Sequence, residues 1–145
     1  MNTAAIAIIT LAFVVAGNGA DKAAEKEIKR FEGDWKLIAL VHDGKGIEPG
    51  ENVLKIRGDR ITEKSSEDVL RFTLNPGKKV REIDLIGVEG RHKGETMPGI
   101  YILDGDLLVI CHAHVSDKGR PIDFGCVPES GRRLLVFQRV NAAKD

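Results

Sequence analysis

The sequence predicts an all-β fold, a small antiparallel barrel of about eight strands preceded by a short N-terminal helix. Two observations carry this prediction. Short segments downstream of Gly33 alternate apolar and polar side chains with a period of two, and Gly, Pro, Asn and Asp separate them. Trp35 stands at the start of the first apolar stripe and Arg139 near the end of the last, which suggests that the two ends of the sheet meet. A closed sheet has no free edges, so a small domain can stay soluble without a partner.

The elements follow from local spacing. Residues 21–31 place Ala24, Ile28 and Phe31 at helical spacing, and Gly33 ends this helix. Strands are expected at residues 35–42, 53–57, 60–64, 69–74, 80–87, 99–103, 107–115 and 134–140. The strongest hairpin signal is Asp104-Gly105, because a tight turn of this kind needs a positive φ.

Side-chain alternation predicts which face of each strand is buried. In the first strand, Trp35, Leu37, Ala39 and Val41 share a face, opposite His42. The inward faces of the other strands are likewise predicted to be apolar.

Arg139 shares a face with the apolar residues Leu135 and Phe137 of the last strand. A charge in line with the core needs a partner, and the indole of Trp35 would serve through a cation–π contact of about 1–2 kcal/mol. The alternative is that the arginine stem covers core atoms while its guanidinium reaches water.

The chain has 145 residues, which favours one domain. Residues 1–19 are predicted to be a signal peptide, because the segment is uncharged, its apolar run is short for a membrane span, and Gly17 and Gly19 suit cleavage after Gly19. Residues 20–32 form the helix and linker, 33–141 the barrel and 142–145 a tail. We therefore expect an exported, periplasmic or extracellular protein. The alternative, an uncleaved leader, is its one expected route of membrane contact.

Charge and cysteine content limit the partners and the covalent framework. The 22 basic and 22 acidic residues balance, which argues against nucleic acid as a partner. In an oxidising compartment, Cys111 and Cys126 would form one disulfide worth about 3 kcal/mol, or they remain two separate buried thiols. The spacing of the two cysteines does not decide between these alternatives.

His112 and His114 form the site-like pair of the sequence. At positions i and i+2 of a strand they project from one face, a spacing that metal sites use, and His42 or His92 would add a third ligand, with Cys111 on the opposite face. The alternative is a pair of strand-end histidines without metal. No serine has the context of a nucleophile elbow and no phosphate-binding loop is present, so the sequence predicts neither an enzyme nor a cofactor.

Gly33-Asp34-Trp35 at the start of the first strand, with Arg139 near the end of the last, is similar to the lipocalin signature. More specifically, the chain resembles a family of small, secreted, lipocalin-like domains of unknown function that is abundant in planctomycetes. The matching stretches are 33–37, 43–44, 72–76, 83–85, 99–107, 110–111, 120–121 with Phe124, and 136–139. The resemblance implies a secreted β-barrel and no activity.

The expected function is that of an exported, non-enzymatic domain that binds a small apolar ligand or another component of the cell envelope. The expected ligand-binding residues are those of the barrel interior, with a dry pocket near Trp35. These residues are Trp35, Leu37, Phe72, Tyr101 and Arg139. Two alternatives stay open: a metal-binding protein or metal-dependent enzyme that uses His112 and His114, and a structural or inhibitory module with a filled barrel.

Overall fold

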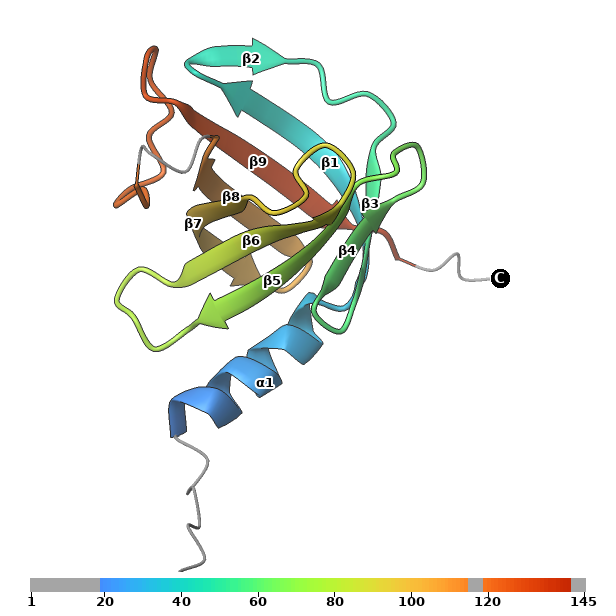
Figure 1. Cartoon of the computed structure of the whole chain (residues 1–145), viewed down its shortest axis with the longest axis vertical. Coiled ribbons are helices and arrows are strands. Elements are labelled where there is room, and N and C mark those ends of the chain that lie inside the picture. Colours follow the sequence, from blue (N-terminus) through green and yellow to red (C-terminus); the bar gives the residue numbers. More distant parts are fainter. Residues whose placement is uncertain (1–18, 115–118, 142–145) are drawn as a thin grey trace, which may run out of the picture.

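In the computed structural model, antiparallel strands close into a barrel and a short helix lies against one end of it (Figure 1). The structure describes residues 19–114 and 119–141. The helix is α1 (Gly19–Phe31). The strands are β1 (Gly33–His42), β2 (Lys45–Ile47), β3 (Val53–Arg57), β4 (Arg60–Glu63), β5 (Val69–Asn75), β6 (Glu82–Glu89), β7 (Thr96–Asp104), β8 (Leu107–Ala113) and β9 (Arg132–Arg139). The predicted all-β barrel with its N-terminal helix is confirmed.

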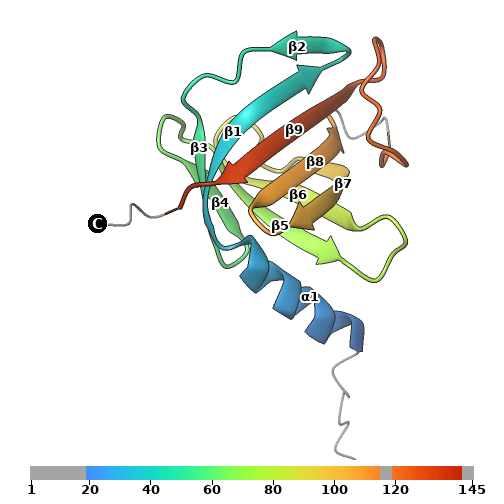
Figure 2. The same ribbon diagram turned by 180° about the vertical axis from the view of Figure 1, so that it is seen from behind.

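The sheet closes where β9 meets β1. The strands follow the chain order from β1 through β3 to β9, and β9 pairs with β1 to complete a ring of eight, as Figure 2 shows from behind. In this pairing Trp35 lies opposite Arg139, and the guanidinium carbon is 4.2 Å from the centroid of the indole. The predicted cation–π contact between the two ends of the sheet is therefore confirmed.

A β-bulge in β1 overturns the predicted alternation of its second half. The register with β9 shifts between Leu37 and Ala39, so Ile38 is an extra residue. Beyond the bulge, Leu40 faces Leu135 of β9 and His42 faces Arg133, and Leu40 packs on the core. The prediction that Ala39 and Val41 face the interior and His42 the exterior was wrong, because one inserted residue exchanges the two faces.

The strand β2 was not predicted. It pairs with the second half of β1 through a two-residue turn, Asp43-Gly44, in which both residues have positive φ. Asp-Gly is a strong hairpin signal, but β2 has three exposed residues and no apolar alternation that would mark it as a strand. The predicted hairpin at Gly105 is confirmed, with Asp104 paired to Leu107.

The helix α1 covers the end of the barrel at which β1 begins, which we call the closed end (Figure 1). Phe31 and Trp35 are both completely buried there. The Phe31 ring lies 5.2 Å from that of Phe72 and 5.1 Å from that of Tyr101, the second in an edge-on arrangement. Aromatic side chains therefore fill the closed end. No helix in the described ranges has the length and apolar character needed to span a membrane.

Candidate ligand-binding site

The opposite end of the barrel, where β1 ends and β9 begins, is the open end. It contains a cavity of about 260 Å³. The walls include apolar side chains from five strands: Leu37, Leu85, Met97, Ile110, Leu135 and Phe137. Polar and charged side chains gather at its mouth: Glu63, Asp68, Arg91, His92, His114 and Arg133. The cavity thus combines apolar walls with a polar entrance.

Strand alternation places the polar groups of β8 and β9. On β9, Phe137, Leu135 and Arg133 follow one another at intervals of two and all three line the cavity. On β8, Ile110 and His112 do the same, and His112 lies opposite Arg133 in the register. Each stripe is therefore apolar toward the closed end and polar at the mouth.

His112 is buried and neutral. Its exposed fraction is 4%, and its Nδ1 lies 2.9 Å from the carbonyl oxygen of Ala113. Because a carbonyl only accepts, Nδ1 carries the hydrogen in this contact. Burial lowers the pKa of His112 to about 4, so the ring is uncharged at neutral pH.

Three further imidazoles and an arginine meet at the mouth. The His114 ring lies 5.0 Å from that of His42 and 6.5 Å from that of His92. His92 contacts Glu95 at 3.0 Å, and a terminal nitrogen of Arg133 lies 3.4 Å from Nδ1 of His42. The predicted proximity of His42 and His92 to the histidine pair is present. Nevertheless, in residues 19–114 and 119–141 no three His, Cys, Asp or Glu side chains are arranged to hold a metal ion.

Two buried polar atoms at the mouth have no hydrogen-bond partner among the described residues: Nδ1 of His114 and Nε of Arg133. Burial lowers the pKa of both side chains, because it disfavours their charged forms. A buried polar group without a partner costs free energy that a bound ligand can recover.

The carboxylates at the mouth have other partners. The Asp68 carboxylate accepts a hydrogen bond of 2.6 Å from the backbone amide of Arg91 and pairs with the Arg91 side chain at 3.6 Å. The backbone amide of Asp68 donates to the Ser66 hydroxyl at 3.1 Å. The Arg91 amide is the main reason why the pKa of Asp68 is lowered. Glu63 accepts a hydrogen bond from Ser65.

The predicted ligand-binding residues divide between the two ends of the barrel. Leu37 lines the cavity, whereas Trp35, Phe72 and Tyr101 belong to the packed core of the closed end. Arg139 donates from that end to the carbonyl oxygens of Arg30 and Glu32. The cavity therefore lies at the end of the barrel opposite to the expected pocket near Trp35, because the helix fills the space beside the indole.

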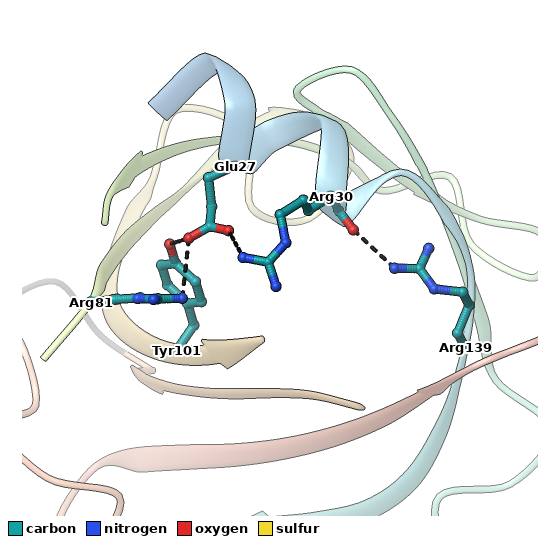
Figure 3. A network of polar contacts seen from close by, with 5 residues as sticks. All are labelled: Glu27, Arg30, Arg81, Tyr101 and Arg139. Carbon is teal, nitrogen blue, oxygen red and sulfur yellow. Dashed lines mark hydrogen bonds and ion pairs between the residues drawn. The ribbon is translucent and has the colours of Figure 1, made fainter. Parts of the chain in front are cut away.

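Glu27 of α1 is the unforeseen polar residue of the closed end, with an exposed fraction of 5% (Figure 3). The Tyr101 hydroxyl donates to its Oε2 at 3.0 Å, Arg81 contacts the same oxygen at 3.3 Å, and Arg30 binds the other oxygen. Burial and the Glu27 charge raise the pKa of Tyr101. The tyrosine therefore stays protonated, and the network holds the helix on the barrel.

The two cysteines are free thiols in the structure. Cys111 is buried on the outward face of β8, as the alternation predicts, and burial raises its pKa. The Cys126 thiol lies 3.1 Å from the carbonyl oxygen of Arg132.

Arg133 and Met97 are site residues that the sequence reasoning missed. The signal for Arg133 was present, since the alternation that aligns Arg139 with Leu135 and Phe137 also includes Arg133 at the other end of the stripe. Met97 lies two residues before the segment predicted to begin at residue 99, whereas β7 begins at Thr96. Comparisons with protein-family models, curated proteins and solved structures found no match to this chain.

Proposed function

We propose that the protein is an exported, non-enzymatic, lipocalin-like barrel that holds a small apolar molecule in the cavity at its open end. The observation that carries this proposal is the cavity itself, with apolar walls and a polar entrance. The packed closed end supports it, because a ligand would have a single route of entry.

The volume limits the size of the ligand. A cavity of about 150 Å³ is enough for benzene, which has six non-hydrogen atoms. By proportion, the cavity of about 260 Å³ suits a molecule of about ten non-hydrogen atoms. The alternative of a filled barrel fits the closed end but not the open end.

The cavity provides its own reporter. The chain has two methionines, Met1 and Met97, and only Met97 lines the cavity among the described residues. Protein labelled with ¹³C at the methionine methyl groups therefore gives one cavity resonance. Trp35 is a poor reporter, because it is buried at the closed end.

We expect 1-octanol, an uncharged probe of nine non-hydrogen atoms, to shift the Met97 methyl resonance saturably. Leu135→Trp, which fills the cavity, should abolish this shift. Ile102→Trp is the matched control, because Ile102 is 45% exposed on the outside of β7, and this variant should bind as the parent does.

A Met97 resonance that does not respond to 1-octanol or to other small apolar molecules would contradict the proposal. That result would favour the other function expected from the sequence, in which the surface of the barrel contacts another component of the cell envelope.

The export part of the proposal rests on the uncharged leader. Residues 1–18 lie outside the described residues, and α1 begins at Gly19, the residue predicted to precede the cleavage site. N-terminal sequencing of the protein recovered from its native compartment tests this cleavage, and a retained leader would contradict it.

A further inference from the structure

Arg133 is the cation at the mouth that has no carboxylate partner among the described residues. Arg133 lies on the same face of β9 as Leu135 and Phe137, so it faces the interior of the barrel. In the register it lies between His42 of β1 and His112 of β8. Its described polar neighbour, His42, is an uncharged acceptor when it faces the guanidinium, since a guanidinium only donates. The charge of Arg133 is therefore partly buried and not neutralised by these contacts.

The other arginine of the cavity differs in this respect. Arg91 is paired with Asp68, and 82% of its side chain is exposed. On the strand that carries Arg133, the preceding residue Arg132 is paired with Asp123 at 2.9 Å. Arg133 is thus distinguished from two nearby arginines by the lack of such a partner.

His114 supplies a second unpartnered atom at the same mouth. Its Nδ1 and the Arg133 Nε are both buried, and both residues line the cavity. The Arg133 Nε can only donate a hydrogen bond, and the neutral His114 ring can donate from Nδ1. The group that satisfies both atoms together is a hydrogen-bond acceptor, and a negative charge would also neutralise the guanidinium.

We propose that the occupant of the cavity is a small apolar monocarboxylate, whose head group accepts hydrogen bonds from Arg133 and His114 while its hydrocarbon part lies between Leu135, Met97 and Phe137. This inference rests on the proposed function and adds the chemistry of the head group. A carboxylate of about ten non-hydrogen atoms, such as octanoate, matches the volume of about 260 Å³.

The test compares three probes that share one hydrocarbon chain: octanoate, 1-octanol and octylamine. Calorimetry gives each affinity, and the Met97 methyl resonance shows that the chain enters the cavity. We expect octanoate to bind at least about tenfold more tightly than 1-octanol, as a charge-assisted hydrogen bond implies. Octylamine should bind most weakly.

Arg133→Met keeps the apolar stem and removes the guanidinium. It should reduce octanoate affinity to that of 1-octanol and leave 1-octanol binding unchanged. Arg132→Met is the matched control, because it removes the same charge from the neighbouring position of β9, and it should retain the preference for octanoate.

The outcomes separate this inference from the proposed function. Equal binding of octanoate and 1-octanol, or a preference for octylamine, would overturn the carboxylate and leave the apolar site standing. If no probe shifts Met97, both proposals fail. Should Arg133→Met not fold, the ¹⁵N resonance of the Arg133 Nε in the parent protein decides: octanoate should shift it and 1-octanol should not, and equal responses would overturn the inference.

Discussion

His112 lines the cavity and also affects the stability of the fold. A histidine that is buried and neutral needs its ring to stay unprotonated, and β8 supplies a carbonyl acceptor for its one ring hydrogen. The residue thus takes part in the core as an uncharged group, although the sequence presents it as a candidate metal ligand.

This burial has a consequence for acid stability. The pKa of His112 is lowered from 6.5 to about 4 in the folded protein, so between these values the unfolded chain binds a proton that the folded protein does not. The stabilising effect of the neutral ring is complete above pH 6.5 and is lost as the pH falls toward 4. This one residue therefore contributes about 3 kcal/mol to the pH dependence of the free energy of unfolding.

We expect the free energy of unfolding of His112→Phe to fall less steeply between pH 7 and pH 4 than that of the parent, as measured by urea denaturation. His92→Gln is the control, because His92 is partly exposed and already contacts Glu95. The same slope in all three proteins would show that His112 does not titrate in this way.

At the scale of elements, Gly87 of β6 determines where the loop between β6 and β7 lies. A Cβ atom at this position would meet the carbonyl oxygen of His92 at 1.7 Å, and the Gly87 amide donates to the Glu95 carbonyl at 2.9 Å. The close approach of strand and loop brings His92 and Arg91 to the mouth of the cavity.

Gly87→Ala should destabilise the protein by about 1–3 kcal/mol and displace this loop, because backbone has to move to admit the methyl group. Thermal unfolding measures the first effect, and a changed His92 ring resonance reports the second. Gly46→Ala is the matched control, since no atom lies within 4 Å of its added Cβ, and its effect should stay within about 0.5 kcal/mol. An unchanged loop in Gly87→Ala would contradict the close packing.

At the scale of the whole molecule, the barrel has two different ends. Arg139 joins three parts of the closed end: it stacks on Trp35, donates to the last turn of α1 through the Arg30 carbonyl, and pairs with Asp106 at 3.2 Å. Helix and sheet closure are thereby coupled at this end, and the cavity lies at the other end.

Arg139→Met should therefore lower the free energy of unfolding by about 2–4 kcal/mol, because it removes charge-assisted hydrogen bonds and the cation–π contact. Arg71→Met is the control. Its guanidinium also binds a carboxylate, Asp59, but is 55% exposed, so the loss should stay below about 1 kcal/mol. Equal losses in the two variants, measured by denaturant unfolding, would show that Arg139 does not couple helix and sheet.

The fold class, the helix and the eight strands of the ring could all be predicted from the amino-acid sequence. Period-two alternation and turn residues are local signals, and the Trp35–Arg139 pair was the one long-range contact that they revealed. Leu37 was the single predicted ligand-binding residue that also lines the cavity.

The position of the cavity and the side chains at its mouth depend instead on how distant segments of the chain pack together. The bulge at Ile38 turned His42 toward His114, and the loop between β6 and β7 brought His92 near His114 as well. Neither a register shift nor a loop position leaves a periodic pattern, because both depend on how distant segments pair and pack. For the same reason the sequence did not reveal that α1 would fill the end near Trp35 and leave the other end hollow.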